Sequence, residues 1–419
     1  MLKKIKTNIT ATKLLVVLMC LMILSSQSIY ELSGWGKYLK LMMFALSIVV
    51  GLSSLFEEKL VNEKGGIFFF LVFTSYIFVL YILNSYNSGE GLTSFLITYL
   101  TLAFIFLYFR FNKLERYTNS YLLSLLTNII IFFACISLIM WLIISIFDLV
   151  QPTQYVQLNW GIPHFIPSYF YVYFETQNVS FGSFTFMRNT WIYPEGPIYS
   201  FFLSFALAYN VFIKNNRICS KSSLILIITI LTTGSSTGII ALAAMAFSRL
   251  ITYLKKWGKL INSLVVIAAT ITLGVTIYFV IRQKTLNSQT SLNVRFEDIV
   301  AGYQSWLVHP VIGDGYGNYS ILLSKMSSSR LVLNGNTGFS SGLSLLAAYG
   351  GLSLLLIYFI PIFKGIYIGG RNNINILFFS LIIIFLLLTT IVQTNFVMLI
   401  TLPFLLTLRK KSTNQKEHI

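Results

Sequence analysis

Charged side chains are scarce in this sequence. Only 10% of its 419 residues are Asp, Glu, Lys or Arg, whereas soluble domains average roughly 25%. So little charge cannot cover a water-exposed globular surface, because such surfaces consist largely of charged and polar side chains. The composition therefore excludes the soluble classes and indicates a membrane protein.

Acidic residues and cysteines are also few. The chain has 13 Asp and Glu residues and three cysteines, Cys20, Cys135 and Cys219. The cysteines lie in apolar runs or on the predicted inner side, so they suggest neither a disulfide framework nor a metal site. Asp314 has no second carboxylate at a matching spacing. We therefore predict no metal and no cofactor.

Apolar sequence is abundant instead. Hydrophobic residues make up 56% of the chain, and runs long enough to cross about 30 Å of hydrocarbon recur throughout. We predict an all-α polytopic integral membrane protein, with a single transmembrane domain over 1–419 and about twelve transmembrane helices. The predicted spans are 13–32, 38–56, 66–84, 91–109, 121–147, 197–213, 222–234, 236–254, 260–281, 342–363, 373–391 and 394–408.

Two boundaries in this count rest on short breaks. Residues 222–254 are nearly continuous apolar sequence interrupted at "TTGSSTG", and 373–408 are interrupted only at 393–395. Each segment could form one long helix, a tight hairpin or a pair with one re-entrant member. We favour hairpins, because merging one pair would invert the orientation of everything between it and the next.

Basic residues indicate the orientation. With alternating spans and a cytoplasmic N-terminus, all but eight of the 30 Lys and Arg residues fall on the inner side, as the positive-inside rule requires. Both termini are then cytoplasmic, and the N-terminal apolar run is expected to be a retained signal anchor. The net charge of +17 is explained by this orientation and by anionic membrane lipids, so we expect no nucleic-acid partner. The eight outer cations are Lys37, Lys40, Arg188, Arg282, Lys284, Arg295, Lys325 and Arg330.

Two long extracytoplasmic loops, 148–196 and 282–341, hold most of the polar residues, so we expect a functional site there. In the first loop, Arg188 and Glu195 stand just before the span that opens at Pro197. The prolines of "YPEGP" restrict the backbone and would hold the Glu195 carboxylate at the mouth of that span. The two side chains could form an interfacial ion pair or bind substrate. The loop's many aromatic rings could anchor it at the headgroup level or stack on sugars.

The second loop has a helical rhythm followed by a glycine-rich turn. "NVRFEDIVAGYQSWLVHP" reads as a helix ended by Pro310, with His309 at its C-terminal end. The apolar positions expected on this helix are Val294, Ile299, Trp306 and Leu307. The glycines of "GDGYGN" could let backbone amides approach a diphosphate, or could simply make a compact turn between helices.

Four short elements in these regions resemble the bacterial O-antigen polymerase and ligase superfamily. Arg295 followed by "HPVIGDGYGNY" is similar to its "R…(N/H)P…G.G.g.y" signature, and "FMRNTWIYPEGPIYSFFLSFALAY" to its "R..G.f.EP..f..fl..al" element. "TTGSSTGIIALAAM" and "SGLSLLAAYGGLSLLLIYF" resemble two further segments, in family order. The sequence departs from the family pattern in three places. The basic residue that often follows the serine is missing in "SST", and Thr190–Trp191 stand where a small residue usually follows the arginine. Phe339–Ser340 replace the His–Asn pair that ligases carry. The missing histidine favours a polymerase over a ligase.

The resemblance implies an enzyme of the bacterial cell membrane that makes capsular, O-antigen or exopolysaccharide chains on the outer face. Donor and acceptor would be polyprenyl-diphosphate-linked oligosaccharides, with a flippase and a chain-length regulator as further partners. Arginine suits the diphosphate leaving group because its guanidinium is permanently charged and bidentate. Glu195 is the preferred base, and His309 is expected to be a phosphate clamp. The candidate catalytic residues are Arg188, Glu195, Arg295 and His309, and the candidate substrate-binding residues are Arg282, Lys284, Asp314, Tyr316, Lys325 and Arg330.

Two other classes stay open from the sequence. A lipid-linked oligosaccharide flippase or another transporter would carry ionisable residues along a pathway at mid-membrane. The predicted spans contain almost none, which counts against transport. A non-enzymatic membrane scaffold would tolerate loss of the outer arginines.

Overall fold

The computed structural model describes every residue except 1, 58–63, 86–90, 113–114, 116–119, 159–162, 182–183, 255–273, 275–288, 329, 332–337 and 409–419. The described chain is mainly helical, and seven of its helices are long and apolar enough to cross a membrane. They are built on α2 (Gly36–Glu57), α3 (Lys64–Ser85), α4 (Leu92–Phe111), α5 (Tyr121–Trp141), α6 (Gly196–Ala208), α8 (Ser236–Leu254) and α12 (Gly342–Asn372). Four further helices have shorter apolar stretches, namely α1 (Leu2–Leu24), α7 (Lys221–Thr232), α13 (Ile374–Thr389) and α14 (Phe396–Thr407).

Every predicted span that the structure describes in full or in large part overlaps a helix. Eleven of the twelve predicted spans overlap a helix of the structure. The twelfth, 260–281, lies outside the described residues except for Gly274. The chain therefore has the architecture of a multi-pass membrane protein, and the count of twelve spans stays a prediction.

Both disputed segments form hairpins, as predicted. The chain turns between Thr232 and Ser236 through Gly234, whose φ is +57°, and α8 then runs back to the start of α7. At that end, Arg249 Nη2 donates a hydrogen bond to Asn215 Oδ1 at 3.1 Å. The second break separates α13 from α14, and the end of α14 returns to α12, where Lys364 donates to the Leu406 carbonyl. Each of these two segments therefore forms two successive helices instead of one long helix.

The helix α6 is the centre of the molecule. Of its residues and their continuation to Ile213, 94% are buried, and it packs against α5, α7, α8 and α13. Its start is fixed by "YPEGP": Glu195 is the extended residue before the helix and Pro197 stands in its first turn, where a missing N–H costs nothing. A site at the start of α6 is therefore built on the most deeply buried of the long apolar helices.

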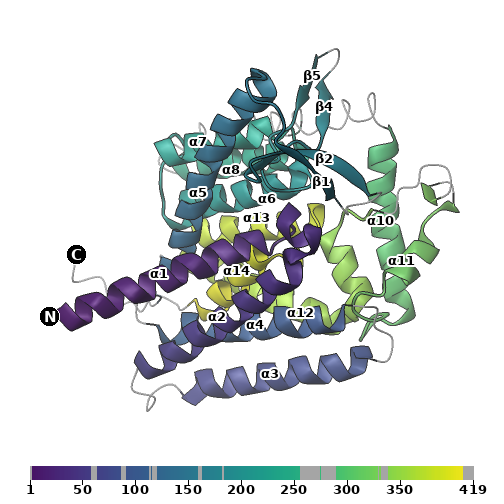
Figure 1. Ribbon diagram of the computed structural model, residues 1–419. Coiled ribbons are helices and arrows are strands. Elements are labelled where there is room, and N and C mark those ends of the chain that lie inside the picture. Colours follow the sequence, from purple (N-terminus) through teal and green to yellow (C-terminus); the bar gives the residue numbers. More distant parts are fainter. Residues whose placement is uncertain are drawn as a thin grey trace.

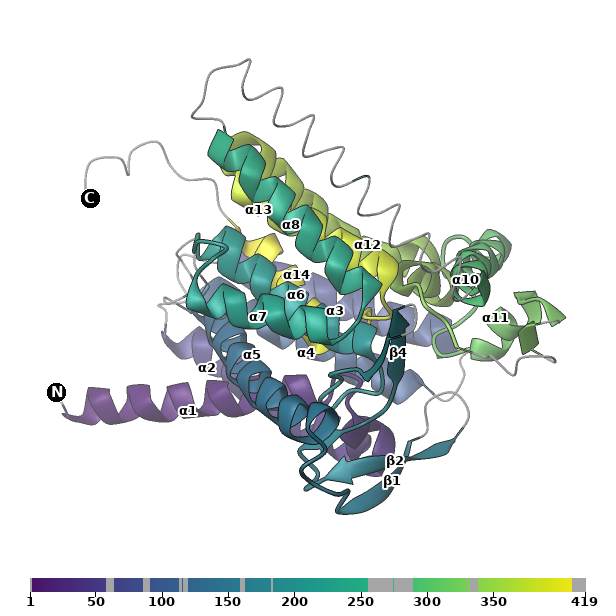
Figure 2. The same ribbon diagram turned by 90° about the horizontal axis from the view of Figure 1, so that it is seen from above.

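The two predicted outer loops gather at one end of the helices (Figures 1 and 2). The first contains two small antiparallel sheets that the sequence analysis did not predict. The second contains α10 (Gln289–Val308) and the short α11 (Tyr319–Lys325). The helix α10 lies across the ends of the bundle helices rather than along them (Figure 1). The strands are β1 (Gln154–Leu158), β2 (His164–Tyr169), β3 (Tyr173–Phe174), β4 (Asn178–Phe181) and β5 (Phe184–Met187).

The sequence correctly predicts α10 and its end before Pro310, but the expected apolar face is wrong. Ile299 is 50% exposed and Leu307 is 55% exposed. The buried face consists of small and polar residues, namely Asp298, Ala301, Gly302 and Ser305. The reason is close packing on α12: a Cβ at Gly302 would lie 2.6 Å from Ser344 Cβ, so only small side chains fit at this contact.

Candidate active site

Arg188 follows directly after β5 and is held on both sides. Its backbone N–H donates to the Gln177 carbonyl at 3.0 Å, and Nη1 donates to Gln177 Oε1 at 3.4 Å. The preceding carbonyl, of Met187, accepts a hydrogen bond from Trp141 Nε1 at 2.8 Å, and the next N–H, of Asn189, donates to the Thr232 carbonyl at 3.0 Å. The arginine therefore sits between the β4–β5 hairpin, α5 and the turn of "TTGSSTG".

Glu195 lies close to Arg188 because Gly196 leaves room for a tight contact. A Cβ at Gly196 would lie 2.7 Å from the Thr233 carbonyl oxygen and 3.3 Å from Arg188 Cδ. Only glycine lets the start of α6, the arginine side chain and the α7–α8 turn approach in this way. The Glu195 side chain makes no capping hydrogen bond to α6.

Arg295, on α10, lies within electrostatic range of Glu195. Its Nη1 donates to the Thr389 carbonyl, at the end of α13, at 3.4 Å. Burial lowers the pKa of Arg295, and the negative charges of Glu195 and Asp298 oppose that shift. Burial likewise lowers the pKa of Arg188, and Glu195 again opposes it. One carboxylate therefore acts on two guanidinium groups that come from the two separate loops.

The Arg188 guanidinium keeps an unused donor. Its Nε is buried and has no hydrogen-bond partner among the described residues. Leaving a buried charged donor without an acceptor is costly unless a ligand or water supplies one. This part of the site is thus suited to an anion with several oxygen acceptors.

Arg330, a predicted substrate-binding residue, forms an internal ion pair with Asp298. Asp298 lies one turn beyond Arg295 on α10. Its Nη1 donates to Asp298 Oδ1 at 2.7 Å, and the other oxygen of that carboxylate accepts from Ser340 Oγ at 2.5 Å. Asp298 is fully buried and Arg330 is 3% exposed. The pair ties the segment after α11 to α10.

His309 is distant from Arg295. Arg295 lies in the second turn of α10 and His309 follows its last residue, so the two are about 21 Å apart along the helix axis at 1.5 Å per residue. His309 Nδ1 is 2.6 Å from Asp314 Oδ1, and Ser305 Oγ donates to the second oxygen of that carboxylate. The His309 side chain is still 48% exposed. This carboxylate–imidazole pair is therefore a separate feature and cannot share one diphosphate with Arg295.

The glycine-rich turn packs into a break in α12. At Gly351 the backbone leaves helical geometry, with φ +55° and ψ −151°, and the N–H groups of Leu352 and Ser353 donate instead to the carbonyls of Pro310 and Val311. Asp314 N–H donates to the Ala348 carbonyl at 2.8 Å, and Tyr316 N–H donates to Asn84 Oδ1 at 3.1 Å. The N–H groups of Asp314 and Tyr316 thus donate hydrogen bonds within the protein. This geometry favours a compact turn between helices over a cradle for a diphosphate.

The remaining predicted site residues lie elsewhere. Tyr316 is buried against the rings of Phe95, Tyr99 and Tyr349. Lys325 is exposed at the end of α11. Arg282 and Lys284 lie outside the described residues. Their roles in binding stay predictions.

Several residues of the site were not predicted from the sequence. Asp298 follows Arg295 by three positions, which places the two side chains on one helix face, so this residue could have been found. Gln177, Thr389 and the carbonyls of the α7–α8 turn carry no local signal, because only the tertiary fold brings them to the arginines.

No group of three or more His, Cys, Asp or Glu side chains with metal-binding geometry occurs in the part of the chain that the structure describes. Metal independence itself stays a prediction. Comparison of the chain with models of known families, with curated proteins and with solved structures finds no match.

Proposed function

We propose that this chain is a membrane glycosyltransferase that polymerises polyprenyl-diphosphate-linked oligosaccharides into a polysaccharide. The observation that carries the proposal is that the carboxylate of Glu195 interacts electrostatically with both Arg188 and Arg295. The two arginines come from two loops that the sequence resemblance also selects. A pair of guanidinium groups beside a carboxylate suits a reaction with an anionic leaving group and a proton to remove.

In the proposed reaction, a sugar hydroxyl of the acceptor attacks the anomeric carbon of the donor sugar that is attached to the diphosphate. The new C–O bond forms as the bond to the diphosphate oxygen breaks, and the diphosphate leaves with the electron pair. Glu195 takes the proton of the attacking hydroxyl. Arg188 and Arg295 stabilise the charge that develops on the leaving oxygen.

Burial makes the two arginines effective in this role. Guanidinium groups stay protonated even where burial lowers the pKa, because the ordinary pKa of arginine exceeds 12. Their attraction to a diphosphate is stronger in a partly buried site than in water, because the effective dielectric constant there is lower. Fixed donors also need no reorganisation when the leaving group becomes charged.

The length of α10 places His309 and Asp314 away from this reacting centre. His309 is half-exposed while Asp314 is buried, and binding of the sugar chain by this pair stays a prediction. A sugar chain that extends from the diphosphate across the outer surface could reach it.

The direct test uses purified protein with a defined polyprenyl-diphosphate oligosaccharide and no added metal. We expect a ladder of products that differ by one repeat unit. Arg188→Lys and Arg295→Lys should each reduce the rate by about 100-fold or more, because lysine keeps the charge but not the planar, bidentate donor geometry. The matched control is Lys37→Ala, which removes an exposed cation on the same predicted side and should leave the ladder unchanged.

Two outcomes would contradict the proposal. Near-normal ladders from both lysine variants would remove the arginine pair from the mechanism. Transfer of the oligosaccharide to a different acceptor, without a ladder, would identify the ligase-type reaction that the sequence also left open.

A further inference from the structure

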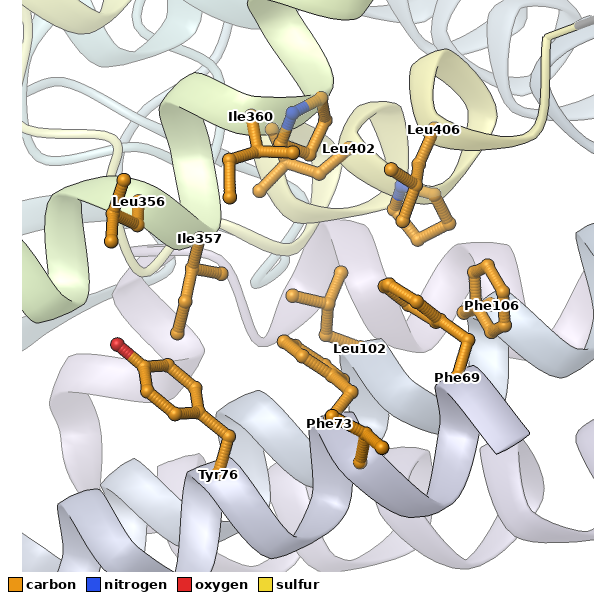
Figure 3. Close-up of a pocket in the computed structure, with 13 residues that line it drawn as sticks. Phe69, Phe73, Tyr76, Leu102, Phe106, Leu356, Ile357, Ile360, Leu402 and Leu406 are labelled. Carbon is orange, nitrogen blue, oxygen red and sulfur yellow. The ribbon is translucent and has the colours of Figure 1, made fainter. Parts of the chain in front are cut away.

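A second candidate site runs along the helices, and its basic end lies at the end of α3 that is far from the glycine-rich turn. An apolar groove of about 330 Å³ separates α3 from α4, α12 and α14. Figure 3 shows Phe69, Phe73 and Tyr76 of α3 facing Leu356 and Ile360 of α12 across this space. All the side chains that line it are apolar or aromatic apart from the Tyr76 hydroxyl.

The groove continues into a smaller, basic pocket. This pocket of about 230 Å³ shares Phe69, Phe106 and Leu406 with the groove, and Arg110 and Lys364 line its far wall. None of its lining residues is acidic. Arg110 stands in the last turn of α4, and Lys364 donates to the carbonyl of Leu406 near the end of α14. An apolar channel thus ends in two positive charges.

The opposite end of the groove is closed. Tyr76 bridges α3 and α12 there, since its hydroxyl donates to the Ser353 carbonyl at 2.9 Å. Ser353 lies just past the break in α12, next to the glycine-rich turn. A chain that lies in the groove therefore has its polar end at Arg110 and Lys364, away from Arg188 and Arg295.

The length of the groove fits one leaflet of a bilayer. Gly65, in the basic pocket, and Tyr76, at the closed end of the groove, mark the two ends of the pocket and groove together on α3. At 1.5 Å per residue they are about 16 Å apart, and the apolar part from Phe69 to Tyr76 covers about 10 Å of this length. Half of the hydrocarbon core measures about 15 Å, so most of one acyl chain of a leaflet can lie in the groove while its head group stays at the basic end.

We propose that this groove is a binding site for a phospholipid with an anionic head group, whose phosphate contacts Arg110 and Lys364 and whose acyl chain lies between α3 and α12. In the predicted orientation the lipid belongs to the cytoplasmic leaflet. The site is independent of the proposed glycosyl transfer. Only 17% of the most apolar stretch of α3 is buried in the protein, so lipid can reach this helix.

The test is to measure lipid binding to the purified full-length chain in detergent. Phosphatidylglycerol with a photoreactive acyl chain is titrated, bound lipid is counted by native mass spectrometry, and cross-linked peptides are mapped. We expect cross-links to α3 and α12 or α14. Arg110→Gln should weaken binding about fivefold, since one basic residue at a membrane surface contributes about that factor.

Two matched controls isolate the charge and the groove. Arg371→Gln removes a cation that lies over the Tyr367 ring on the same helix as Lys364, and it should not change binding. Val72→Trp places a large ring on the wall of the groove and should abolish the mapped cross-links. Leu71→Trp changes the adjacent exposed residue, which does not line the groove, and should leave the cross-links in place.

The proposal fails if Arg110→Gln and Arg371→Gln bind the lipid equally well. It also fails if phosphatidylcholine, whose head group is neutral overall, binds as tightly as phosphatidylglycerol. Displacement of the phospholipid by an equal or lower concentration of undecaprenyl phosphate would replace it with a polyprenyl phosphate as the occupant.

Discussion

Glu115, in the connection between α4 and α5, is a buried acid. Its Oε1 accepts a hydrogen bond from Leu122 N–H at 2.7 Å, while its Oε2 is buried without a partner among the described residues. Burial raises the pKa of Glu115 from 4.5 to about 7. The folded protein therefore holds this proton over a pH range in which the unfolded chain releases it.

This shift predicts a pH-dependent stability. The stabilisation is fully present below pH 4.5, and it is lost as the pH rises to about 7. Glu115→Gln imitates the protonated acid and should remove this slope, so that the variant is more stable than the wild type above pH 7, by about 3 kcal/mol at most. Thermal unfolding in detergent at pH 5 and pH 8 measures the effect. Equal pH slopes for the two proteins would show that Glu115 is already ionised when folded.

The arginines illustrate what sequence alone provides at the scale of residues. Arg188, Glu195 and Arg295 were selected because cations on the outer side are few and because "YPEGP" fixes a carboxylate at a helix start. In the structure Glu195 lies within electrostatic range of both arginines. His309 lies apart from Arg295, because the straight helix α10 separates them by 14 residues, and residue spacing alone does not predict this straightness.

At the scale of elements, a buried ion pair joins α10 to the segment after α11. Arg330→Met leaves the fully buried Asp298 without its counter-charge, which should destabilise the protein by about 3–5 kcal/mol. The double variant Asp298→Asn/Arg330→Met removes both charges and should recover most of that loss. The coupling is tested by the apparent unfolding temperatures of the wild type, Arg330→Met, Asp298→Asn and the double variant. Additive effects of the two single substitutions would mean that the pair contributes no coupling energy.

The glycine-rich turn and the break in α12 depend on each other. A Cβ at Gly313, whose φ is +69°, would lie 2.5 Å from Gly350 N. Gly313→Ala should therefore push the turn away from α12 and free the N–H groups of Leu352 and Ser353. Hydrogen exchange at these two amides should accelerate. Gly34→Ala is the control, because Gly34 has φ +96° but open space around it, and it should leave both amides protected. Unchanged exchange in Gly313→Ala would contradict the docking of the turn.

Elements differ in how well their sequences predict them. Pro310 ends α10 as expected, because proline blocks helix continuation. The sequence does not predict the strands of the first loop, since its dense aromatic residues suit membrane anchoring or stacking on sugars and do not by themselves indicate strands. In the structure Tyr173 and Phe174 are buried while Tyr155 and Phe165 are exposed. The break at Gly351 was also missed, because "AAYGGLSLL" carries an uninterrupted apolar pattern and the turn that satisfies its backbone lies elsewhere in the chain.

At the scale of the whole molecule, charge and hydropathy together predict the topology. Apolar runs define the helices, and the breaks at 232–236 and 390–395 set which ends face the same side. The structure agrees with this alternation where helix ends meet, since the ends of α4 and α14 and the start of α3 line one pocket. The two loops with the candidate site meet at one end of the bundle (Figure 1). Only the distribution of the basic residues indicates which end of the bundle is cytoplasmic.

A native cysteine makes the orientation testable. Cys219 is exposed and is predicted to be cytoplasmic, whereas Lys325 is exposed at the end of α11 and is predicted to be external. In intact cells, a membrane-impermeant maleimide should label Lys325→Cys in a Cys219→Ser background but should not label Cys219 in the wild type. After permeabilisation both should react, because both positions are exposed. The reverse pattern would place the arginines and Glu195 on the cytoplasmic side, where a polymerase of the proposed kind could not meet substrates presented at the outer face.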